Sequence, residues 1–170
     1  QVVDAAMVDG VGALMASLYG MHAAGIVTDK RHTNILDGGA HFYNCYETSD
    51  GLYISIASIE KKFYQLLLDL TGFNDENHSA HSDKEQWADN RILMAKLMKT
   101  KTRAQWCDLL EGTDVCFAPV LSVTEAPKHP HNIARNAFEK VDGVIQPAPA
   151  PRFSRTPSKI QKGPSEVGAD

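Results

Sequence analysis

The stretch LDGGAHFYNCYETSDGLYISIASIEKKFY, Leu36 to Tyr64, decides the fold of this chain. Within it, two β-rich runs, 42–47 and 52–57, flank the tetrapeptide Thr-Ser-Asp-Gly. Asp-Gly between two such runs is a strong hairpin signal, because these residues accept the backbone angles of a tight turn. The sequence therefore predicts an antiparallel β-hairpin over 42–57.

A helix is predicted directly after this hairpin. Ser58 can cap its start, Glu60 falls in its first turn, and Gly72 ends it. The buried stripe of this helix is expected to consist of Phe63, Leu66, Leu67 and Leu70. The stretch thus combines a hairpin and a helix, and it delivers one carboxylate to the helix start.

The sequence after this helix predicts two further helices and a strand. Residues 87–98 have a helical period, and the Thr102–Gln105 run is a capping box that opens a helix closed by Gly112. The apolar run Val115–Leu121 is expected to be a short strand, restricted to a sheet edge by Pro119.

The last third of the chain predicts smaller elements. We expect one or two short helical turns over 122–135, broken by Pro127 and Pro130. A second hairpin is predicted over 138–146 around its Asp-Gly pair, and the proline-rich run 147–157 should be extended.

The N-terminal segment predicts one helix, Ala5 to Ala24, with apolar residues at spacings of three and four. These residues are Met7, Val11, Leu14, Met15, Leu18 and Met21. The uncharged run from Gly10 to Thr28 has the length of a membrane span, but it is rich in glycine and alanine. We therefore expect this helix to pack closely inside protein, with no membrane association.

Composition limits the possible functions. The 170 residues contain 43% hydrophobic and 22% charged residues, typical of a globular protein, and the net charge is −4. An acidic chain lacks the basic face expected of a nucleic-acid-binding protein. The three cysteines are odd in number and have no CxxC spacing, which predicts reduced thiols and a cytoplasmic location.

The organisation predicted from these elements is α+β. Residues 40–137 read as a compact small domain, 1–39 as a strand end, helix and linker, and 138–170 as a return segment with an extended tail. Because the chain opens at Gln1 as if inside an element, we expect it to be a fragment of a longer protein.

Glu60 is the candidate site residue that the residues alone suggest. Its position has a purely structural explanation, since acidic residues favour the first turn of a helix. The free N–H groups there also stabilise the ionised carboxylate. Such a group suits the orientation of a histidine, or stabilisation of its charged form, better than it suits general-base catalysis.

Other chemistry is not indicated by the sequence. The histidines, including His78, His81 and the His129-Pro130-His131 run, lack acidic partners at metal-ligand spacing, so no metal site is predicted. Nucleophile-elbow, Walker and GxGxxG motifs are absent. From residue chemistry alone, the chain is an α+β piece with one carboxylate of interest.

Five runs of this chain form a recognisable set. They are QVVDAAMVDG at 1–10, NILDGGAHFYNCYE at 34–47, DGLYISIASIEKKFY at 50–64, TDVCFAPVLSVTEAPKHPH at 113–131 and QPAPAPRFSRTP at 146–157. Together these runs resemble the α-methylacyl-CoA racemase branch of the family III CoA-transferase (CaiB/BaiF) superfamily, in the same order and spacing over essentially the whole chain.

The resemblance implies an interlocked homodimer with a Rossmann-like large domain and a small α+β domain. The chain would be the C-terminal part, comprising the small domain with flanking pieces of the large one. The implied reaction is interconversion of (R)- and (S)-2-methylacyl-CoA thioesters in fatty acid metabolism. A histidine and an aspartate, both upstream of this sequence, would exchange the α-proton through an enolate, without metal or other cofactor.

By the same resemblance, Glu60 matches the glutamate that pairs with the catalytic histidine. Ile35, Leu36, Tyr43 and Ile59 would line the acyl-chain surface. The fragment alone would then be inactive, because it lacks both proton carriers. The alternative is an acyl-CoA:carboxylate CoA-transferase of the same family, whose aspartate nucleophile would also lie upstream.

Three positions depart from the family pattern. His41 stands where proline is common, Asn44 where aspartate is usual, and Lys61 where proline commonly follows the glutamate. These changes touch the loop beside the implied site and bear on acyl preference. Glu60 itself is unaffected.

Overall fold

The computed structural model describes residues 1–74 and 81–168. The chain forms two compact units, Gln1–Val120 and Leu121–Asp170, which are described separately. The second unit begins inside the segment 40–137 predicted as the small domain. The three-part division predicted from the sequence refers to the fold of the longer protein and stays a prediction.

The predicted hairpin is confirmed and forms two strands of a three-stranded sheet. Strands β1 (Tyr43–Glu47) and β2 (Tyr53–Ala57) pair antiparallel, with Cys45 opposite Ser55. The turn closes through the hydrogen bond from the Gly51 N–H to the Thr48 carbonyl, 3.1 Å, and Gly51 has a φ of 75°. The glycine supplies the left-handed conformation that the sequence predicted.

The third strand, β3 (Phe117–Val120), pairs antiparallel with β2 and lies at the edge of the sheet, as Pro119 predicted. It is shorter than the predicted run Val115–Leu121. Cys116 has a φ of 57°, outside the β region, so the strand begins only after it. The proline lies in a strand with one free edge, where no ladder donor is lost.

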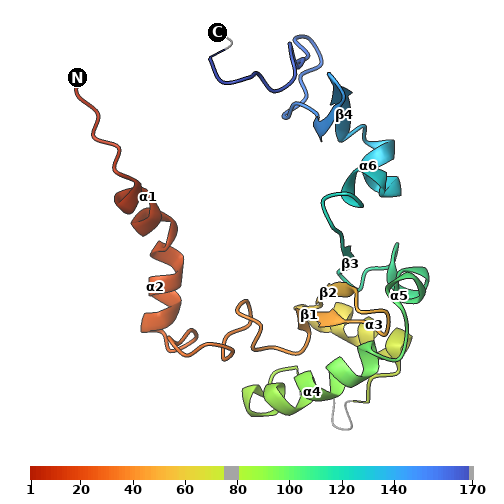
Figure 1. Cartoon of the computed structure of the whole chain (residues 1–170). Helices are drawn as coiled ribbons and strands as arrows, with labels where there is room; N and C mark the ends of the chain where they lie inside the picture. The colour runs from red at the N-terminus through yellow and green to blue at the C-terminus, as the bar shows by residue number, and fades with distance from the viewer. Residues whose placement is uncertain (75–80, 169–170) are drawn as a thin grey trace. The chain divides into compact units, whose positions relative to one another are not determined.

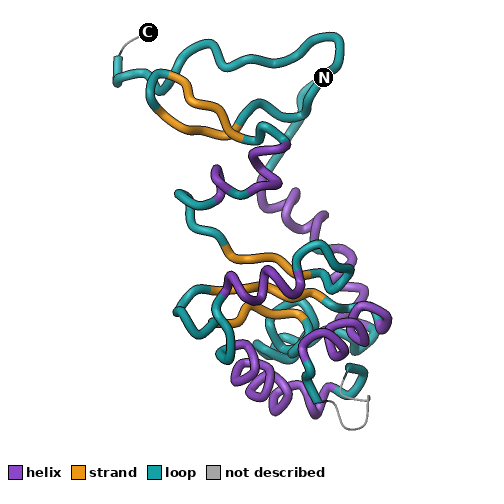
Figure 2. Tube along the Cα trace, turned by 90° about the vertical axis from the view of Figure 1, so that its right-hand side faces the viewer, coloured by secondary structure: helices purple, strands orange, loops and turns teal. Residues whose placement is uncertain are grey.

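Three helices pack around this sheet (Figures 1 and 2). They are α3 (Lys61–Thr71), α4 (Trp87–Met98), which follows the short turn η1 (Lys84–Gln86), and α5 (Arg103–Leu110). The predicted capping box is confirmed, since Thr102 and Gln105 bond each other's backbone N–H groups at the start of α5. The buried core includes Phe42, Ile54, Ile56, Leu67, Met94, Met98, Trp106 and Leu110.

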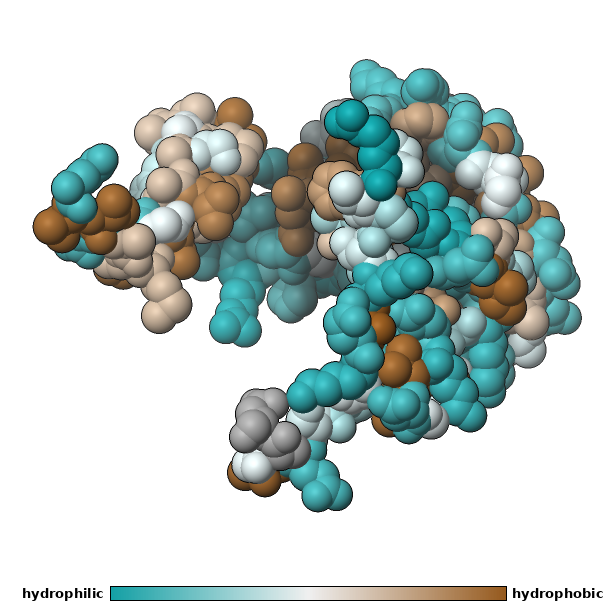
Figure 3. Space-filling model, turned by 90° about the horizontal axis from the view of Figure 1, so that it is seen from above, coloured by the Kyte–Doolittle hydropathy of each residue, from teal (hydrophilic) through white to brown (hydrophobic). Residues whose placement is uncertain are grey.

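The single N-terminal helix predicted from Ala5 to Ala24 is wrong in two respects. The segment forms two helices, α1 (Met7–Leu14) and α2 (Ala16–Ala23), because Met15 has a ψ of −4° and turns the chain between them. Neither helix has a fully buried residue: most of the apolar stripe is exposed, and only Leu18 and Met21 are half-buried. Figure 3 shows apolar residues, in brown, on the surface.

The unit Leu121–Asp170 contains short elements in the predicted order. They are η2 (Ala126–Lys128), α6 (Pro130–Ala134), and the antiparallel strands β4 (Phe138–Val141) and β5 (Val144–Pro147). Pro127 and Pro130 occupy the first turns of η2 and α6, so they begin these helices rather than break them. Asp142 and Gly143 both have positive φ, 50° and 86°, and the predicted second hairpin is confirmed.

Within the described residues, no helix combines the length and apolar character that crossing a bilayer requires. The same part of the chain holds no group of three or more His, Cys, Asp or Glu residues suited to bind a metal ion.

Candidate functional site

Glu60 lies at the boundary between the hairpin and α3. It is the N-cap residue, with φ −77° and ψ 138°, rather than a member of the first turn. Its carbonyl accepts hydrogen bonds from the N–H groups of Phe63 and Tyr64, both 3.0 Å. Its side chain is exposed and makes no capping hydrogen bond, so this carboxylate has no role in capping α3.

Ser58, predicted to cap α3, does not do so. It lies two residues before the N-cap, fully buried, and its hydroxyl donates to the carbonyl of Val115 at 2.7 Å. The backbone N–H of Ser58 donates to the Phe42 carbonyl at 2.9 Å. Ser58 therefore joins the segment before Glu60 to two other parts of the chain, at Phe42 just before β1 and at Val115 just before β3.

Cys116 is a neighbour of Glu60 that sequence reasoning missed. Desolvation, then the negative charges of Glu60 and Asp114, raise the pKa of its thiol, while the Lys62 charge opposes this. Cys116 is exposed and its backbone carbonyl accepts from the Ala57 N–H at 3.0 Å. The only sequence signal was the apolar run that contains it, which gave no reason to place it beside Glu60.

Because the charge of Glu60 acts on the Cys116 thiol, we expect the alkylation rate of Cys116 to depend on that charge. In a chain with Cys45→Ser and Cys107→Ser, iodoacetamide at pH 8 should alkylate Cys116 about twofold faster when Glu60 is changed to Gln. Removal of the negative charge lowers the thiol pKa and increases the thiolate fraction. Mass spectrometry of timed samples measures the rate. An unchanged rate would show that Glu60 does not act on this thiol, and Glu139→Gln is the control.

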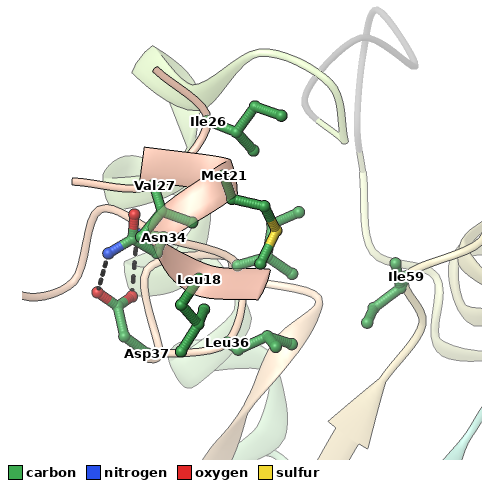
Figure 4. Close-up of a pocket in the computed structure, with 9 residues that line it drawn as sticks. Leu18, Met21, Ile26, Val27, Asn34, Leu36, Asp37 and Ile59 are labelled. Atoms are coloured by element: carbon green, nitrogen blue, oxygen red, sulfur yellow. Dashed lines mark hydrogen bonds between the residues drawn. The ribbon is translucent and has the colours of Figure 1, made fainter. Parts of the chain in front are cut away.

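An apolar pocket of about 490 Å³ lies beside Ile59. Its walls come from α2, from the loop that follows α2, and from the residue before Glu60, as Figure 4 shows. The lining residues are Leu18, Met21, Ile26, Val27, Asn34, Ile35, Leu36, Asp37 and Ile59. The lining is almost wholly apolar side chain, which suits a hydrocarbon chain or another apolar group.

The structure brings together three of the four residues predicted to form an apolar surface. Ile35, Leu36 and Ile59 all line the pocket, although Ile59 lies more than twenty positions after the adjacent pair Ile35 and Leu36. Tyr43 is not among the lining residues and packs instead against the core of the sheet. Leu18 and Met21 join the lining from α2; the sequence placed them only on a helix face.

Two polar residues hold the pocket wall in shape. The Asp37 carboxylate accepts hydrogen bonds from the Asn34 N–H at 3.0 Å and from its amide Nδ2 at 2.9 Å, the two dashed lines in Figure 4. The amide of Asn34 also bonds the backbone of Thr28 in both directions, at 2.9 and 3.0 Å. Ile35 and Leu36 are thus held between two residues whose side chains bond each other.

The pKa of Asp37 reflects this arrangement. Slight desolvation acts to raise it, but hydrogen bonds from the Asn34 side chain and backbone and from the Gly39 N–H outweigh this effect. The pKa of this carboxyl therefore lies below its ordinary value. The contribution of these bonds to stability is present above the unfolded-state pKa and is lost as the pH falls through the folded-state value.

The two glycines after Asp37 have different roles. Gly38 has a φ of 82°, a left-handed conformation that favours glycine. Gly39 has no positive φ, but a Cβ built on it would lie 2.6 Å from the Asn34 carbonyl oxygen and 2.8 Å from that of His32. The loop closes on itself at this point, and only glycine leaves room for it.

Gly39→Ala is therefore expected to destabilise the chain by about 2 kcal/mol, because the clash is with backbone that has no free rotamer. Urea unfolding of the chain Gln1–Asp170 measures this. The matched control is Gly10→Ala in α1, where a Cβ meets nothing within 4 Å and a small gain in helix stability is expected. Equal midpoints for the two variants would contradict this reading of the loop.

His41, which departs from the family pattern, lies in the core beside the hairpin. It is fully buried, and its Nε2 lies 2.8 Å from the Tyr64 hydroxyl oxygen. The Tyr46 hydroxyl donates to the His41 backbone carbonyl at 2.7 Å. These contacts give His41 a structural role in the contact of β1 with α3, and it does not line the pocket.

Phe73 and His81, which follow α3 in the chain, both pack against the core. Phe73 is buried, and the His81 ring stacks on Phe42 at a centroid distance of 4.3 Å. His81 is therefore a packing residue. His78 lies outside the described residues.

The chain belongs to CoA-transferase family III, whose family model matches residues 1–170. It is 39% identical over 160 residues to the alpha-methylacyl-CoA racemase of Mus musculus and 35% identical over 161 residues to that of Homo sapiens. Each alignment covers 93% of this chain and 42% of the relative, so the chain spans less than half the length of these proteins. The resemblance found in the sequence is confirmed.

The fold is shared with solved structures of the same family. A CAIB/BAIF family protein from Brucella suis superposes with a TM-score of 0.62 at 23% identity, covering 99% of this chain and 46% of the other. The predicted α+β class is confirmed: the chain combines small antiparallel sheets with packed helices in the manner of a piece of that fold.

Proposed function

We propose that this chain is the C-terminal part of an enzyme, here called the parent enzyme, that interconverts (R)- and (S)-2-methylacyl-CoA thioesters. The observation that carries the proposal is the 39% identity, over 93% of the chain, to a protein named alpha-methylacyl-CoA racemase. The reaction removes the α-proton to form an enolate and returns a proton to the opposite face. It is an isomerisation, so the acyl-CoA is the substrate and no other cofactor is consumed.

In this proposal Glu60 is a positioning residue. Its carboxylate is exposed and is not used to cap α3, so it is available to a group outside this chain. We propose that it pairs with the catalytic histidine of the parent enzyme and stabilises that histidine when it carries a proton. The histidine and the aspartate that carry the proton lie upstream, so the chain alone should be inactive.

The apolar pocket is proposed to hold the acyl chain. Ile35, Leu36 and Ile59 supply surface next to Glu60, which follows Ile59 directly in the chain. Each methylene that leaves water contributes about 0.8 kcal/mol, so a pocket of this kind favours longer acyl chains. Tyr43 would belong to the same acyl surface by its family resemblance, outside the pocket described here.

The test is exchange of the α-proton of a 2-methylacyl-CoA in deuterated water, followed by NMR or mass spectrometry. The parent enzyme should exchange it, and the chain Gln1–Asp170 should not. A folded parent enzyme that leaves the α-proton in place would overturn the proposal.

A second function is favoured by the name of the family itself, CoA-transferase family III. A transferase would move CoA from an acyl-CoA to a free carboxylic acid through an aspartyl intermediate. Incubation of the parent enzyme with an acyl-CoA and labelled free acids separates the two: label in the thioester without α-proton exchange identifies the transferase.

We also propose that the parent enzyme is an interlocked homodimer located in the cytoplasm and acting in fatty acid metabolism. The exposed apolar residues Met7, Val11 and Leu14 support a protein partner for α1. The three free cysteines support a reducing compartment. Light scattering of the parent enzyme tests the assembly, and a monomer at micromolar concentration would contradict it.

A further inference from the structure

Two side chains from other elements hold the end of the pocket wall. Arg91 on α4 donates through Nη1 to the carbonyls of Gly38 and Gly39, at 3.1 and 3.3 Å. Asn44 on β1 donates through Nδ2 to the same Gly38 carbonyl, at 2.9 Å. Neither Arg91 nor Asn44 lines the pocket.

These bonds fix the wall because the two glycines are linked tightly to it. The Gly39 N–H donates to Asp37 at 3.0 Å, and Gly39 lies against the Asn34 carbonyl with no space for a Cβ. A rotation of the Gly38 or Gly39 carbonyl therefore moves Asp37 and, with it, the Asn34–Asp37 segment that carries Ile35 and Leu36.

Both donors are themselves held in place. The side chains of Trp87, Met94 and Met98 on α4 are buried in the core, so the helix that carries Arg91 is a firm base. The Asn44 Oδ1 accepts from the Cys45 N–H at 2.8 Å, which orients the amide toward Gly38. The planar guanidinium has several donors in a fixed arrangement, which suits two adjacent carbonyls.

We propose that Arg91, together with Asn44, is a positioning residue that sets acyl-chain selectivity by holding the Asn34–Asp37 wall of the pocket. This inference rests on the proposed function of the pocket and adds the residues that shape it. Arg91 and Asn44 act through the Gly38–Gly39 backbone and contact neither the acyl chain nor the reacting atoms.

The expected signature is a change in KM that depends on acyl length, with little change in kcat. In the parent enzyme, Arg91→Met should raise the KM for a long-chain 2-methylacyl-CoA about tenfold and leave that for 2-methylbutanoyl-CoA within about twofold. Arg91→Lys keeps one charged donor and should fall between Met and wild type. Asn44→Ala, which removes the second donor, should shift selectivity in the same direction as Arg91→Met.

The control is Lys96→Met, which removes a positive charge from an exposed position on the same helix. It should leave both KM values unchanged. Circular dichroism and the thermal midpoint establish that each variant is folded. Two results would overturn the proposal. One is an equal rise in KM for long and short substrates. The other is a fall in kcat with no change in KM in the folded Arg91→Lys and Asn44→Ala variants.

A binding measurement separates this inference from the proposed reaction. Calorimetry with long- and short-chain acyl-CoA reports selectivity without turnover. If the wild-type parent enzyme shows no α-proton exchange but binds the long chain more tightly, and Arg91→Met abolishes that preference, the reaction is wrong and the role of Arg91 stands. If exchange is normal and Arg91→Met keeps the wild-type preference, the role of Arg91 is wrong and the reaction stands.

Discussion

Glu60→Gln in the parent enzyme should slow α-proton exchange about a hundredfold while leaving the thermal midpoint nearly unchanged. The amide keeps the size of the side chain and one acceptor oxygen, replaces the other oxygen with an NH2 donor, and removes the charge. Because the carboxylate does not cap α3 and is exposed, its loss costs the fold little. The expected loss of rate comes from the histidine that this carboxylate is proposed to orient and stabilise when protonated.

A pH profile separates this role from a simple loss of structure. A nearby negative charge favours the protonated form of a histidine, so its removal lowers the histidine pKa. The limb of the kcat/KM profile that reports this histidine should therefore move to lower pH in the variant. A uniform loss of rate with an unmoved profile would argue against electrostatic coupling.

Glu85 offers a matched control. It is also an exposed glutamate at the start of a helical element, here in the first turn of η1, and Glu85→Gln removes the same charge. We expect its exchange rate to equal that of wild type. If Glu60→Gln behaves in the same way, Glu60 is only a charge at a helix start, which is the structural explanation that the sequence also allowed.

The parts of the fold that could be predicted from the sequence depend on local interactions. The Asp50-Gly51 turn and the Thr102–Gln105 capping box each form within a few residues, and both occur as expected. The second hairpin, with Asp142 and Gly143 in left-handed conformation, follows the same rule. Side-chain and backbone preferences over four residues suffice for such elements.

The errors come from residues whose partners are distant in the chain. Serine is a favoured N-cap residue, but the Ser58 hydroxyl donates instead to the carbonyl of Val115, 57 positions away. The stripe on α1 and α2 has a helical period, yet its residues on α1 stay exposed and only Leu18 and Met21 are partly covered. Periodicity indicates which face of a helix is apolar and does not indicate what covers it.

In the candidate site, too, some residues could be predicted from the sequence and others could not. The resemblance placed Ile35, Leu36 and Ile59 on one surface, and the structure brings them together around a pocket. It gave no sign of Arg91, whose contact with Gly38 spans 53 positions. A hydrogen bond to a main-chain carbonyl leaves almost no trace in sequence, since any residue can supply the acceptor.

Leu36→Asp in the parent enzyme should weaken binding of a long-chain 2-methylacyl-CoA about 30-fold and change that of a short-chain thioester little. Leu36 lines the pocket yet is 64% exposed, so a carboxylate there remains hydrated until an acyl chain covers it. The penalty therefore arises on binding, when the long chain displaces this water and a charge meets hydrocarbon. For the same reason the stability of the unliganded protein should be almost unchanged.

Ile92→Asp is the control for that experiment, because Ile92 is a similarly exposed apolar residue, 55%, on α4 and outside the pocket lining. Calorimetry with acyl-CoA thioesters of increasing length gives the gain in binding free energy per methylene for each variant. Wild type and Ile92→Asp should show the same positive gain, and Leu36→Asp a gain near zero. A Leu36→Asp variant that keeps the wild-type gain would place the acyl chain elsewhere, and the pocket beside Glu60 would lose its proposed role.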